Sequence, residues 1–366
     1  MIVKNLNLKN FRNYNDESFN FDENVNIIYG NNAQGKTNVL EGIYMFALGK
    51  SNRALKDTEV IKFVNNEAQI SMIFEDSKRE SSSKIIISKN KKKIISVNDI
   101  PVKKNSELVG KFNAVYFGPE YLDLIKGGPK IRRRSIDILL SQIKVNYISV
   151  LSELRKTIEQ KNCILKSDNV DKILLSVLNE KILKNSLSVC KYRFEYIKKT
   201  EEKANILMKE ISCGKENLEI KYISPVGIIE EFNDEEFLTA LKEKMEKNFE
   251  REIYLKESII GPHRDDIEFK INGLDVKNYA SQGQQKTTVL VQKIAEVEIL
   301  KEEKGEYPVL LLDDIMSELD IKRREFVTER IKNMQIFITC TEKEKFENFK
   351  KGKFFEISNG KIIKEG

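Results

Sequence analysis

Short apolar runs separated by polar turns dominate the first ninety residues, a pattern typical of strands. The run Val25–Tyr29 has the length of a buried strand, and it stops at Gly30 before a helical pattern begins near Lys36. Further on, the polar segment 90–93 lies between apolar residues and predicts the tip of a hairpin. The beginning of the chain is therefore expected to form mainly strands, at 1–8, 25–29, 70–74 and 84–88.

The middle of the chain changes to a helical period. After the breakers at 127–129, the apolar residues over 136–154 step alternately by four and three, which predicts a helix with a stripe close to a heptad. A second such stripe covers 183–197. The polar segment 166–172 between them predicts the turn of an antiparallel helical hairpin. A further helix is expected over 235–251.

Strand and loop character returns after residue 257. The segment that starts at Gly283 leads into a long helix expected over 284–301, and four consecutive apolar residues at 309–312 then end at Asp313 and Asp314. Such a run predicts a fully buried, parallel strand with helices on both faces. The last expected elements are a strand at 336–338 and a hairpin of 354–357 with 361–363, turning at 359–360.

Composition limits the class of protein. A chain of 366 residues predicts two or three domains, and 40% hydrophobic with 33% charged residues is typical of a globular protein, not a disordered one. No run of eighteen apolar residues occurs, which argues against a transmembrane helix. The first residues lack the apolar stretch of a signal peptide, so export is not expected.

Cysteine and histidine usage narrows the chemistry. The four cysteines are scattered without a CxxC pair, which agrees with the cytoplasm and argues against a disulfide framework or a zinc site. The single histidine, His263, argues against Ser-His-Asp catalysis and against a multi-histidine metal centre. The formal charge of +6 is compatible with a nucleic-acid partner but is too small to prove one.

A phosphate-binding motif follows the predicted strand Val25–Tyr29. The pattern GxxxxGK[ST] needs glycines that let successive backbone N–H groups face the phosphates, at the positive end of a helix. Its lysine reaches the β- and γ-phosphates, and its hydroxyl binds Mg²⁺. The match is complete and lies between a strand and a helix, as the motif requires, and it consists of Gly30, Asn31, Asn32, Ala33, Gln34, Gly35, Lys36 and Thr37.

The second half of such a site is an acidic residue at the end of an apolar strand. Asp313 directly follows the run 309–312 and fits the Walker B role, which holds Mg²⁺ through water. Asp314 is placed to polarise an attacking water molecule. The alternative is a strand that merely ends in a turn, and the phosphate-binding motif makes this alternative the weaker one.

A third motif, at residues 281–285, indicates which class of ATPase the chain resembles. The segment Ser281, Gln282, Gly283, Gln284 and Gln285 has a serine that can cap a helix and a glycine that keeps the backbone open. In isolation it is an ordinary helix cap. Between the phosphate-binding motif and Asp313, however, it resembles the signature segment of ABC-type ATPases, and the residues 317–320 resemble their D-loop. The expected fold is therefore α/β, an ABC-type ATPase head with a mixed sheet and an inserted, mainly helical lobe.

Within that superfamily the motifs resemble the RecF family of bacterial DNA replication and repair proteins. The resemblance rests on Phe11-Arg12-Asn13-Tyr14, the motifs above, Gly261-Pro262-His263-Arg264-Asp265-Asp266, Phe117-Gly118-Pro119-Glu120, Lys126-Gly127 and the run Arg132 to Arg134. It implies an ATPase lobe of residues 1–120 with 256–366, and a helical lobe of residues 121–255. It also implies a homodimer that forms around DNA when ATP binds. RecO and RecR are the implied partners, with which such a protein helps to load RecA at gaps.

The resemblance also implies roles for individual residues. Lys36 and Thr37 would bind phosphate and Mg²⁺, and Asp313 would be the Walker B acid. The γ-phosphate of the nucleotide bound by the partner subunit would be contacted by Ser281, Gly283 and Gln284. ABC ATPases usually have glutamate at the position of Asp314, and many have a histidine near 339–341 that is absent here. Both departures imply slow hydrolysis. The resemblance implies a weak ATPase that DNA stimulates.

Several residues keep two interpretations. Arg12 is either near the nucleotide or a solvated arginine on an edge strand, and His263 in its Gly-Pro turn is more typical of a packing role. Only the resemblance suggests that Arg264 reaches the dimer seam. For DNA contacts the basic candidates are Lys130, Arg132, Arg133 and Arg134, which could equally form ion pairs within the chain, and a lysine tip at 89, 91, 92 and 93, for which a solvated face is the commoner interpretation.

Two other functional classes are alternatives to a DNA clamp. A chromosome-organising ATPase of the SMC kind needs arms of hundreds of residues, and the roughly 250 residues between the motifs cannot supply them. The ATPase subunit of a membrane transporter would have Gly-Gly in the signature, where this chain has Gly283 followed by Gln284. Both alternatives fit less well than a cytoplasmic, ATP-driven DNA clamp.

Overall fold

The computed structural model describes residues 1–104, 107–342 and 352–366. The chain forms two compact units, Met1–Tyr121 with Lys293–Gly366 (unit 1) and Leu122–Gln292 (unit 2). The helix α9 (Gln282–Lys304) begins in unit 2 and ends in unit 1. Residues 256–292 thus lie in unit 2, although the motifs assign them to the ATPase lobe. Because compact units and functional lobes need not coincide, the lobe boundaries stay a prediction.

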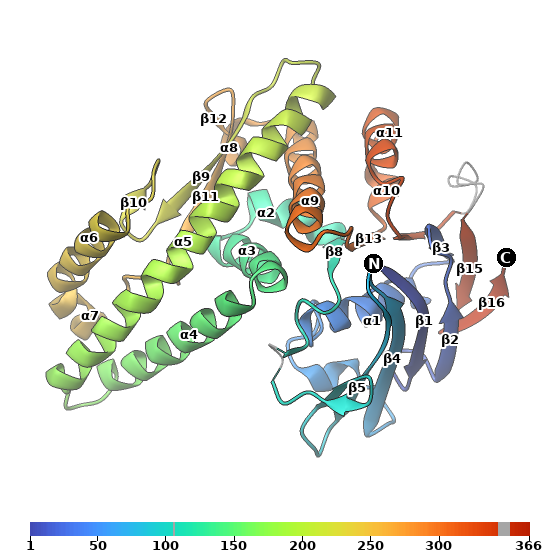
Figure 1. The fold of residues 1–366 in the computed structure, drawn as a ribbon, viewed down its shortest axis with the longest axis horizontal. Helices are drawn as coiled ribbons and strands as arrows, with labels where there is room; N and C mark the ends of the chain where they lie inside the picture. Colours follow the sequence, from blue (N-terminus) through green and yellow to red (C-terminus); the bar gives the residue numbers. More distant parts are fainter. Residues whose placement is uncertain (105–106, 343–351) are drawn as a thin grey trace. The chain divides into compact units, whose positions relative to one another are not determined.

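Unit 1 contains a six-stranded, mostly parallel sheet in the order β16-β15-β3-β14-β13-β8 (Figure 1). The predicted buried strand is confirmed as β13, which pairs in parallel with β8 and β14 and has no exposed residue. The strands β15 and β16 form the predicted hairpin, joined by Asn359 and Gly360, both with positive φ. The bounds are β3 (Val25–Tyr29), β8 (Ala114–Phe117), β13 (Val309–Asp313), β14 (Ile336–Cys340), β15 (Lys353–Ser358) and β16 (Lys361–Glu365).

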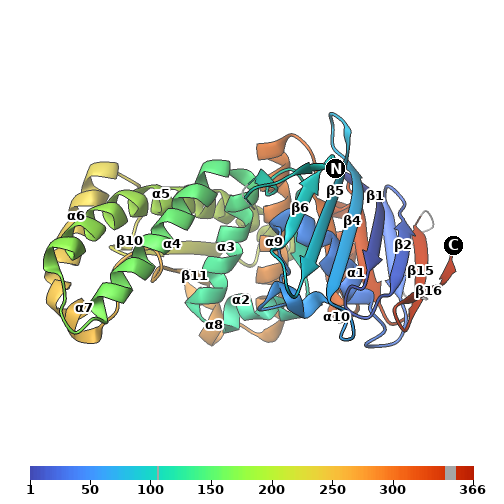
Figure 2. The same ribbon diagram turned by 90° about the horizontal axis from the view of Figure 1, so that it is seen from below.

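A second sheet of unit 1 is antiparallel, in the order β2-β1-β4-β5-β6-β7. Figure 2 shows β6, β5, β4, β1 and β2 side by side. The strand β4 alternates buried and more exposed residues along most of its length, as expected for a sheet with one face on a core. The bounds are β1 (Ile2–Lys9), β2 (Asp16–Asn20), β4 (Glu67–Glu75), β5 (Glu80–Ser88), β6 (Ile94–Val97) and β7 (Ile100–Pro101).

The helix α1 (Lys36–Leu48) lies between the two sheets. It packs against β1 on one side and against β8, β13 and β14 on the other. Eleven of its thirteen residues are buried, from Lys36 and Val39 to Leu48. A helix that is apolar nearly all round needs such a doubly covered position. The sheet-helix-sheet sandwich therefore fixes the first residue of α1, which is the lysine of the phosphate-binding motif.

Side chains from distant parts of the chain join the two sheets. The rings of Phe21 and Phe337 meet edge to face at 4.7 Å, and Phe19 contacts Phe355 at 5.7 Å. The amide of Gln335 donates to the carbonyl oxygen of Val3 at 2.8 Å and accepts from its N–H at 2.6 Å. Unit 1 also contains η1 (Asp57–Val60), α10 (Ile315–Glu318) and α11 (Ile321–Arg330), and η3 (Pro119–Leu122) lies where the two units meet in the chain.

Unit 2 is mainly helical. The predicted hairpin is confirmed as α4 and α5, which pack against each other around the turn 166–171 (Figure 1). The prediction of one helix over 136–154 is wrong, because the backbone is extended at Lys144 (φ −121°, ψ 104°) and divides α3 from α4. The helix expected over 235–251 likewise divides at Asn248. The helices are α2 (Asp123–Lys126), α3 (Pro129–Ile143), α4 (Val145–Leu165), α5 (Lys172–Ile211), α6 (Asp234–Lys247), α7 (Phe249–Leu255) and α8 (Val276–Tyr279).

Unit 2 also contains a four-stranded antiparallel sheet in the order β10-β9-β11-β12. The first long strand, β9, was missed from the sequence, although Leu218, Ile220 and Tyr222 alternate as a strand requires and are buried. The bounds are β9 (Leu218–Ser224), β10 (Gly227–Ile228), β11 (Asp266–Ile271) and β12 (Leu274–Asp275). Among the described residues, no helix is long and apolar enough to cross a membrane.

Candidate nucleotide site

The phosphate-binding loop connects the end of β3 to the start of α1. Two of its glycines are required by their surroundings. A Cβ on Gly30 (φ 146°) would lie 2.3 Å from the carbonyl oxygen of Ile357, and a Cβ on Gly35 (φ 115°) would lie 2.7 Å from Asn13 Oδ1. Ala33 also has a left-handed backbone (φ 63°). The loop therefore has the curled backbone that the motif predicts.

The side chain of Lys36 folds back across this loop. Its Nζ donates to the carbonyl oxygens of Gly30 at 2.7 Å and Asn31 at 3.0 Å, and the residue is only 4% exposed. These carbonyls are neutral acceptors. Because a hydrogen bond between charged partners is shorter and about twice as strong as one between neutral groups, phosphate oxygens would be the better partners for this ammonium.

Three hydroxyl groups surround the carboxylate of Asp313. Oδ1 accepts from Thr37 at 2.9 Å and from Thr339 at 2.6 Å, and Oδ2 accepts from the hydroxyl of Tyr116 at 2.7 Å. The strands β8, β13 and β14 run in parallel, so their carboxyl ends bring Tyr116, Asp313 and Thr339 to one edge. Thr37 and Asp313, which the sequence placed in one site, therefore do meet. Burial and the charge of Asp313 raise the pKa of Tyr116, which stays a neutral donor.

Tyr116 and Thr339 were not predicted from the sequence as site residues. The signal for Thr339 was present, because it follows the predicted strand 336–338, as Asp313 follows 309–312. The signal for Tyr116 was weaker, because β8 has only four residues and was not recognised.

The oxygen atoms of Thr37 and Asp313 suit a hard cation. Mg²⁺ prefers oxygen ligands and keeps several waters and phosphate oxygens in its coordination shell. No group of three or more acidic, cysteine or histidine side chains that could hold an ion by itself occurs among the described residues. The hydroxyl of Thr37 and the carboxylate of Asp313 therefore fit a Mg²⁺ ion whose remaining ligands are nucleotide phosphates and water.

Asp314 has a strained backbone and an unusual carboxyl group. Its φ of 55° is left-handed, it is the N-cap residue directly before α10, and its N–H donates to Thr339 Oγ1 at 2.9 Å. Burial raises the pKa of Asp314, the charge of Lys36 opposes this rise, and Asp313 and Glu318 add to it. A carboxyl group with a raised pKa near the phosphate-binding lysine is suited to accept a proton from water.

The N-terminal motif holds the phosphate-binding loop from outside. Asn13 Nδ2 donates to the carbonyl oxygen of Gln34 at 2.7 Å, and its Oδ1 accepts from Asn38 at 2.9 Å. The hydroxyl of Tyr14 donates to the carbonyl oxygen of Gly35 at 3.1 Å. These bonds use loop carbonyls and leave the backbone N–H groups of the loop for phosphate.

The turn of the C-terminal hairpin holds the same loop. The N–H of Asn359 donates to Gln34 Oε1 at 2.6 Å, and the N–H of Gly360 donates to the Gln34 carbonyl oxygen at 3.0 Å. A Cβ on Gly360 would lie 2.5 Å from the carbonyl oxygen of Asn13. We call Asn13, Tyr14, Asn359 and Gly360 the clasp; no motif predicted that the two ends of the chain meet at this loop.

Arg12 forms a structural ion pair. Its Nε and Nη2 donate to the two oxygens of Glu41 at 2.9 and 2.6 Å, and Glu41 is fully buried in α1. Ser51 donates to the same carboxylate at 2.5 Å. A bidentate pair of this kind is a strong, oriented contact. It connects the N-terminal motif to the helix that carries Lys36.

The signature segment lies in unit 2 and begins α9. Ser281 Oγ accepts from the N–H of Gln284 at 3.2 Å, and Gln284 Oε1 accepts from the N–H of Ser281 at 2.8 Å, which is a capping box. Gln284 Nε2 also donates to Glu216 at 2.8 Å. Because Ser281 Oγ acts as an acceptor here and is exposed, its proton can still be donated to a phosphate oxygen. Contact of Ser281, Gly283 and Gln284 with a partner's nucleotide stays a prediction.

Two of the four basic candidates for DNA contact are engaged within unit 2. Arg132 is buried, and its Nε and Nη2 donate to Asp266 at 2.6 and 2.8 Å. Arg133 donates to the carbonyl oxygen of Asp265 at 2.5 Å. Lys130 and Arg134 are exposed. The structure thus favours the intramolecular alternative for Arg132 and Arg133.

His263 and Arg264 take part in a packed turn. His263 Nε2 lies 2.9 Å from the carbonyl oxygen of Ser258, and burial lowers the pKa of the imidazole. Arg264 donates to the same carbonyl oxygen at 3.2 Å and pairs with Glu257. Both contacts are local, as the packing interpretation of His263 expects.

Comparisons with known proteins agree with this geometry. Residues 2–362 match the family described as the RecF/RecN/SMC N-terminal domain. The protein named DNA replication and repair protein RecF of Acetivibrio thermocellus is 43% identical over 95% of both chains, and that of Clostridium beijerinckii is 40% identical over 100% of this chain and 99% of its own.

Solved structures show the same similarity. One match is the structure of the recombination mediator protein RecF with ATP, of the RecFOR pathway. The match covers 100% of this chain and 97% of that chain, at a TM-score of 0.94 and 35% sequence identity. A head domain of Smc bound to a domain of ScpA matches with a TM-score of 0.57 and 16% identity, which shows the common fold alone.

Proposed function

This chain belongs to the RecF/RecN/SMC N-terminal domain family and, within it, to the RecF proteins, and from this we propose that it is an ATP-dependent DNA-binding protein of recombinational repair and replication restart. The observation that carries the proposal is the meeting of Lys36, Thr37, Asp313 and Asp314 at one edge of a parallel sheet. This constellation is suited to binding and hydrolysing a nucleoside triphosphate.

The residues divide the chemistry among them. The loop N–H groups and Lys36 bind the phosphates and counter the negative charge that develops on the γ-phosphate. Thr37 and Asp313 hold Mg²⁺, which supplies further positive charge when bound. Asp314 orients the attacking water and accepts its proton. Because aspartate is shorter than the usual glutamate, the water is less well placed and hydrolysis is slow. DNA stimulates this weak activity.

ATP acts as a bridge between two copies of the chain. The nucleotide bound by one subunit would receive the exposed hydroxyl of Ser281 and the amide of Gln284 from the other. A ligand that binds only the dimer stabilises it by mass action, so ATP closes the dimer and hydrolysis opens it. The closed dimer holds DNA at gaps or at junctions of single and double strands. With RecO and RecR it helps to load RecA in the SOS response, in the cytoplasm where chromosomal DNA lies.

The proposal is tested by the mass of the particle in light scattering. ATP with Mg²⁺ should double the mass of the wild type, and should leave Ser281→Arg monomeric although it still binds ATP. Ser167→Arg, in the exposed turn between α4 and α5, is the matched control and should dimerise normally. A wild type that binds ATP yet stays monomeric would show that Ser281 is only a helix cap, and the clamp mechanism would fail.

A further inference from the structure

One end of the antiparallel sheet of unit 1 presents two neighbouring turns. Glu67, at the start of β4, pairs with Ser88, at the end of β5. Just beyond this pair the N–H of Lys89 donates to the carbonyl oxygen of Asn66 at 3.0 Å. The turn before β4, residues 62–65, therefore lies beside the tip that joins β5 to β6, residues 89–93. We call them the Phe63 turn and the lysine tip.

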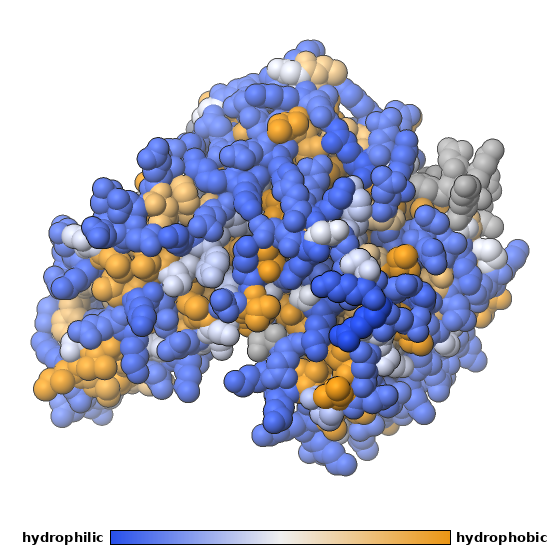
Figure 3. All heavy atoms as spheres, in the orientation of Figure 1, coloured by the Kyte–Doolittle hydropathy of each residue, from blue (hydrophilic) through white to orange (hydrophobic). Residues whose placement is uncertain are grey.

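The Phe63 turn exposes two large apolar side chains. The N–H of Asn65 donates to the carbonyl oxygen of Lys62 at 2.8 Å, so Phe63 and Val64 are at the apex of a tight turn. Phe63 is 95% exposed and Val64 is 82% exposed. Single exposed apolar residues are common on any surface, and Figure 3 shows separate hydrophobic groups on a mostly hydrophilic face. The Phe63 turn differs because the side chains beside it are cationic.

The lysine tip is anchored, and three of its lysines point to solvent. Lys93 donates to the carbonyl oxygen of Gly49 and to Asp57, both at 2.6 Å, which fixes the tip to the segment that follows α1. The exposed lysines are Lys89, Lys91 and Lys92.

Positive charge predominates in this region. The segments 50–66 and 89–93 contain eight basic residues, four in each, and two acidic ones. Both acids are engaged, because Asp57 binds Lys93 and Glu59 accepts from the N–H of Leu55 at 3.1 Å. Glu67, at the start of β4, is also exposed. Clustered, unneutralised lysines on a fixed loop bind phosphate backbones by releasing counterions.

We propose that the lysine tip and the Phe63 turn form a DNA-binding surface, with Lys89, Lys91 and Lys92 on backbone phosphates and Phe63 stacked on a base exposed at a single/double-strand junction. The inference rests on the proposed function, because it presumes that the chain binds DNA. Aromatic rings beside cationic side chains are the usual platform for unpaired bases. The Phe63 turn, with two exposed apolar side chains, is by itself too small for a stable protein interface, which buries about 800 Å² on each partner. Leu55 is the other exposed large apolar residue of segment 50–66.

The test uses the full chain with ATP and Mg²⁺ and a fluorescent duplex with a single-stranded overhang, in anisotropy titrations from 50 to 200 mM salt. For Lys89→Ala/Lys91→Ala/Lys92→Ala, three lost phosphate contacts should weaken the salt dependence, so that the wild-type affinity falls about 40-fold more than that of the variant over this range. Phe63→Ala should lower affinity about 5- to 150-fold without changing the salt slope. Lys361→Ala/Lys364→Ala, two exposed lysines of β16, is the matched control and should behave as wild type.

Each outcome decides a separate question. If the wild type dimerises with ATP but does not bind DNA, the DNA part of the proposed function fails and this inference fails with it. If the wild type binds DNA and the triple variant retains both its affinity and its salt slope, the lysine tip is only a solvated surface. If Phe63→Ala binds DNA normally but no longer dimerises with ATP, the Phe63 turn is a protein contact and the stacking role is wrong.

Discussion

The nucleotide site of unit 1 and a polar network inside unit 2 are both built from charged side chains withdrawn from water. In the nucleotide site, Lys36 donates to two backbone carbonyls, and Asp313 accepts from three neutral hydroxyls. Neither charge meets a charge of opposite sign in these bonds. A nucleotide and its cation would supply stronger partners, so these contacts are exchangeable.

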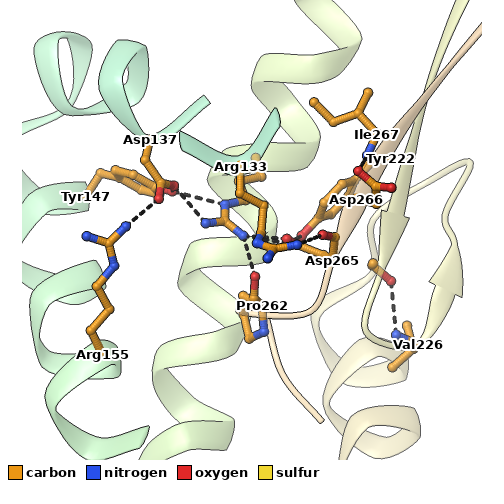
Figure 4. A network of polar contacts seen from close by, with 12 residues as sticks. Arg133, Asp137, Tyr147, Arg155, Tyr222, Val226, Pro262, Asp265, Asp266 and Ile267 are labelled. Atoms are coloured by element: carbon orange, nitrogen blue, oxygen red, sulfur yellow. Dashed lines mark hydrogen bonds and ion pairs between the residues drawn. The ribbon is translucent and has the colours of Figure 1, made fainter. Parts of the chain in front are cut away.

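The network of unit 2 is saturated instead. Arg193, on α5, is 2% exposed, and its Nη1 bonds both oxygens of Asp265 at 2.7 and 2.6 Å. Its Nη2 donates to Asp137 at 2.7 Å and its Nε donates to the hydroxyl of Tyr147 at 3.1 Å. Figure 4 labels the acceptors Asp137, Tyr147 and Asp265 of this network. Asp265 accepts a further bond from Tyr222 at 2.5 Å. Every nitrogen of the guanidinium is thus bonded by groups of the chain itself.

This difference in the partners of buried charges distinguishes residues that stabilise the fold from residues that bind a ligand. A buried charge whose partners are permanent holds helices and strands together, and its hydrogen-bonding nitrogens are already engaged within the chain. A buried charge whose partners are backbone carbonyls can exchange them for phosphate. Substitutions in the network of unit 2 should therefore cost folding free energy first. Substitutions at the nucleotide site should cost binding, with little change in stability.

The largest expected effect is the loss of Arg193. Arg193→Leu leaves Asp265 buried without the cation that bonds both its oxygens, and leaves Asp137 paired with Arg155, which should lower the free energy of unfolding by about 3–5 kcal/mol. Chemical denaturation measures this change. Arg155→Leu is the control, because Arg155 also pairs with Asp137 but is 58% exposed, and exposed pairs contribute about 1 kcal/mol or less. Equal effects of the two variants would mean that the buried network around Arg193 contributes no more to folding than an exposed ion pair.

A substitution at the nucleotide site should have the opposite profile. Lys36→Met removes two hydrogen bonds from a cation to phosphate and should weaken ATP binding by about 3 kcal/mol, or about a hundredfold. Its unfolding midpoint without nucleotide should remain close to that of wild type. Calorimetry of ATP binding and denaturation on the same samples checks both points. Lys4→Met, at an exposed pair with Glu75 and Glu80, should change neither.

The clasp is expected to have a smaller effect on the same site. Asn13→Ala loses the bonds to Gln34 and Asn38, and should weaken ATP binding about 5- to 10-fold because the loop is less well ordered before it meets phosphate. Asn7→Ala loses bonds to Asp16 and Glu17 on β2, which are not bonds to the phosphate-binding loop, and is the control for losing asparagine hydrogen bonds. If Asn13→Ala destabilises the chain but binds ATP normally, the clasp belongs with the permanent contacts.

The contrast also explains what the sequence could predict. The nucleotide site was predictable because its chemistry fixes residue types at fixed spacings, as with Lys36 and Thr37 within one loop. The motifs identified Asp265 and Arg132 only as parts of a family resemblance. Asp265 bonds Arg193, 72 residues away, and Arg132 bonds Asp266, 134 residues away. Permanent partners can come from any element that folding brings near. Periodicity predicted the helices α4 and α5 but not the break at Lys144, because one extended residue leaves the apolar stripe intact.

The smallest expected effect is the pH dependence from His263, which lies in the packed turn of unit 2. Burial lowers the pKa of His263, the charges of Arg264 and Lys161 add to this, and the Ser258 carbonyl and Glu252 oppose it. Nε2 lies 2.9 Å from the Ser258 carbonyl oxygen, and among the described residues the buried Nδ1 has no hydrogen-bond partner, so a second proton would have no acceptor. Since the unfolded chain binds that proton more readily, the stability contribution is fully present above the ordinary pKa of 6.5 and is lost as pH falls towards the lowered pKa.

His263→Gln, which keeps a donor for Ser258 but cannot ionise, should therefore show a shallower fall in melting temperature from pH 7.5 to 5.5 than wild type. Identical profiles would mean that protonation of other groups governs the acid limb, and that the neutral imidazole contributes packing alone.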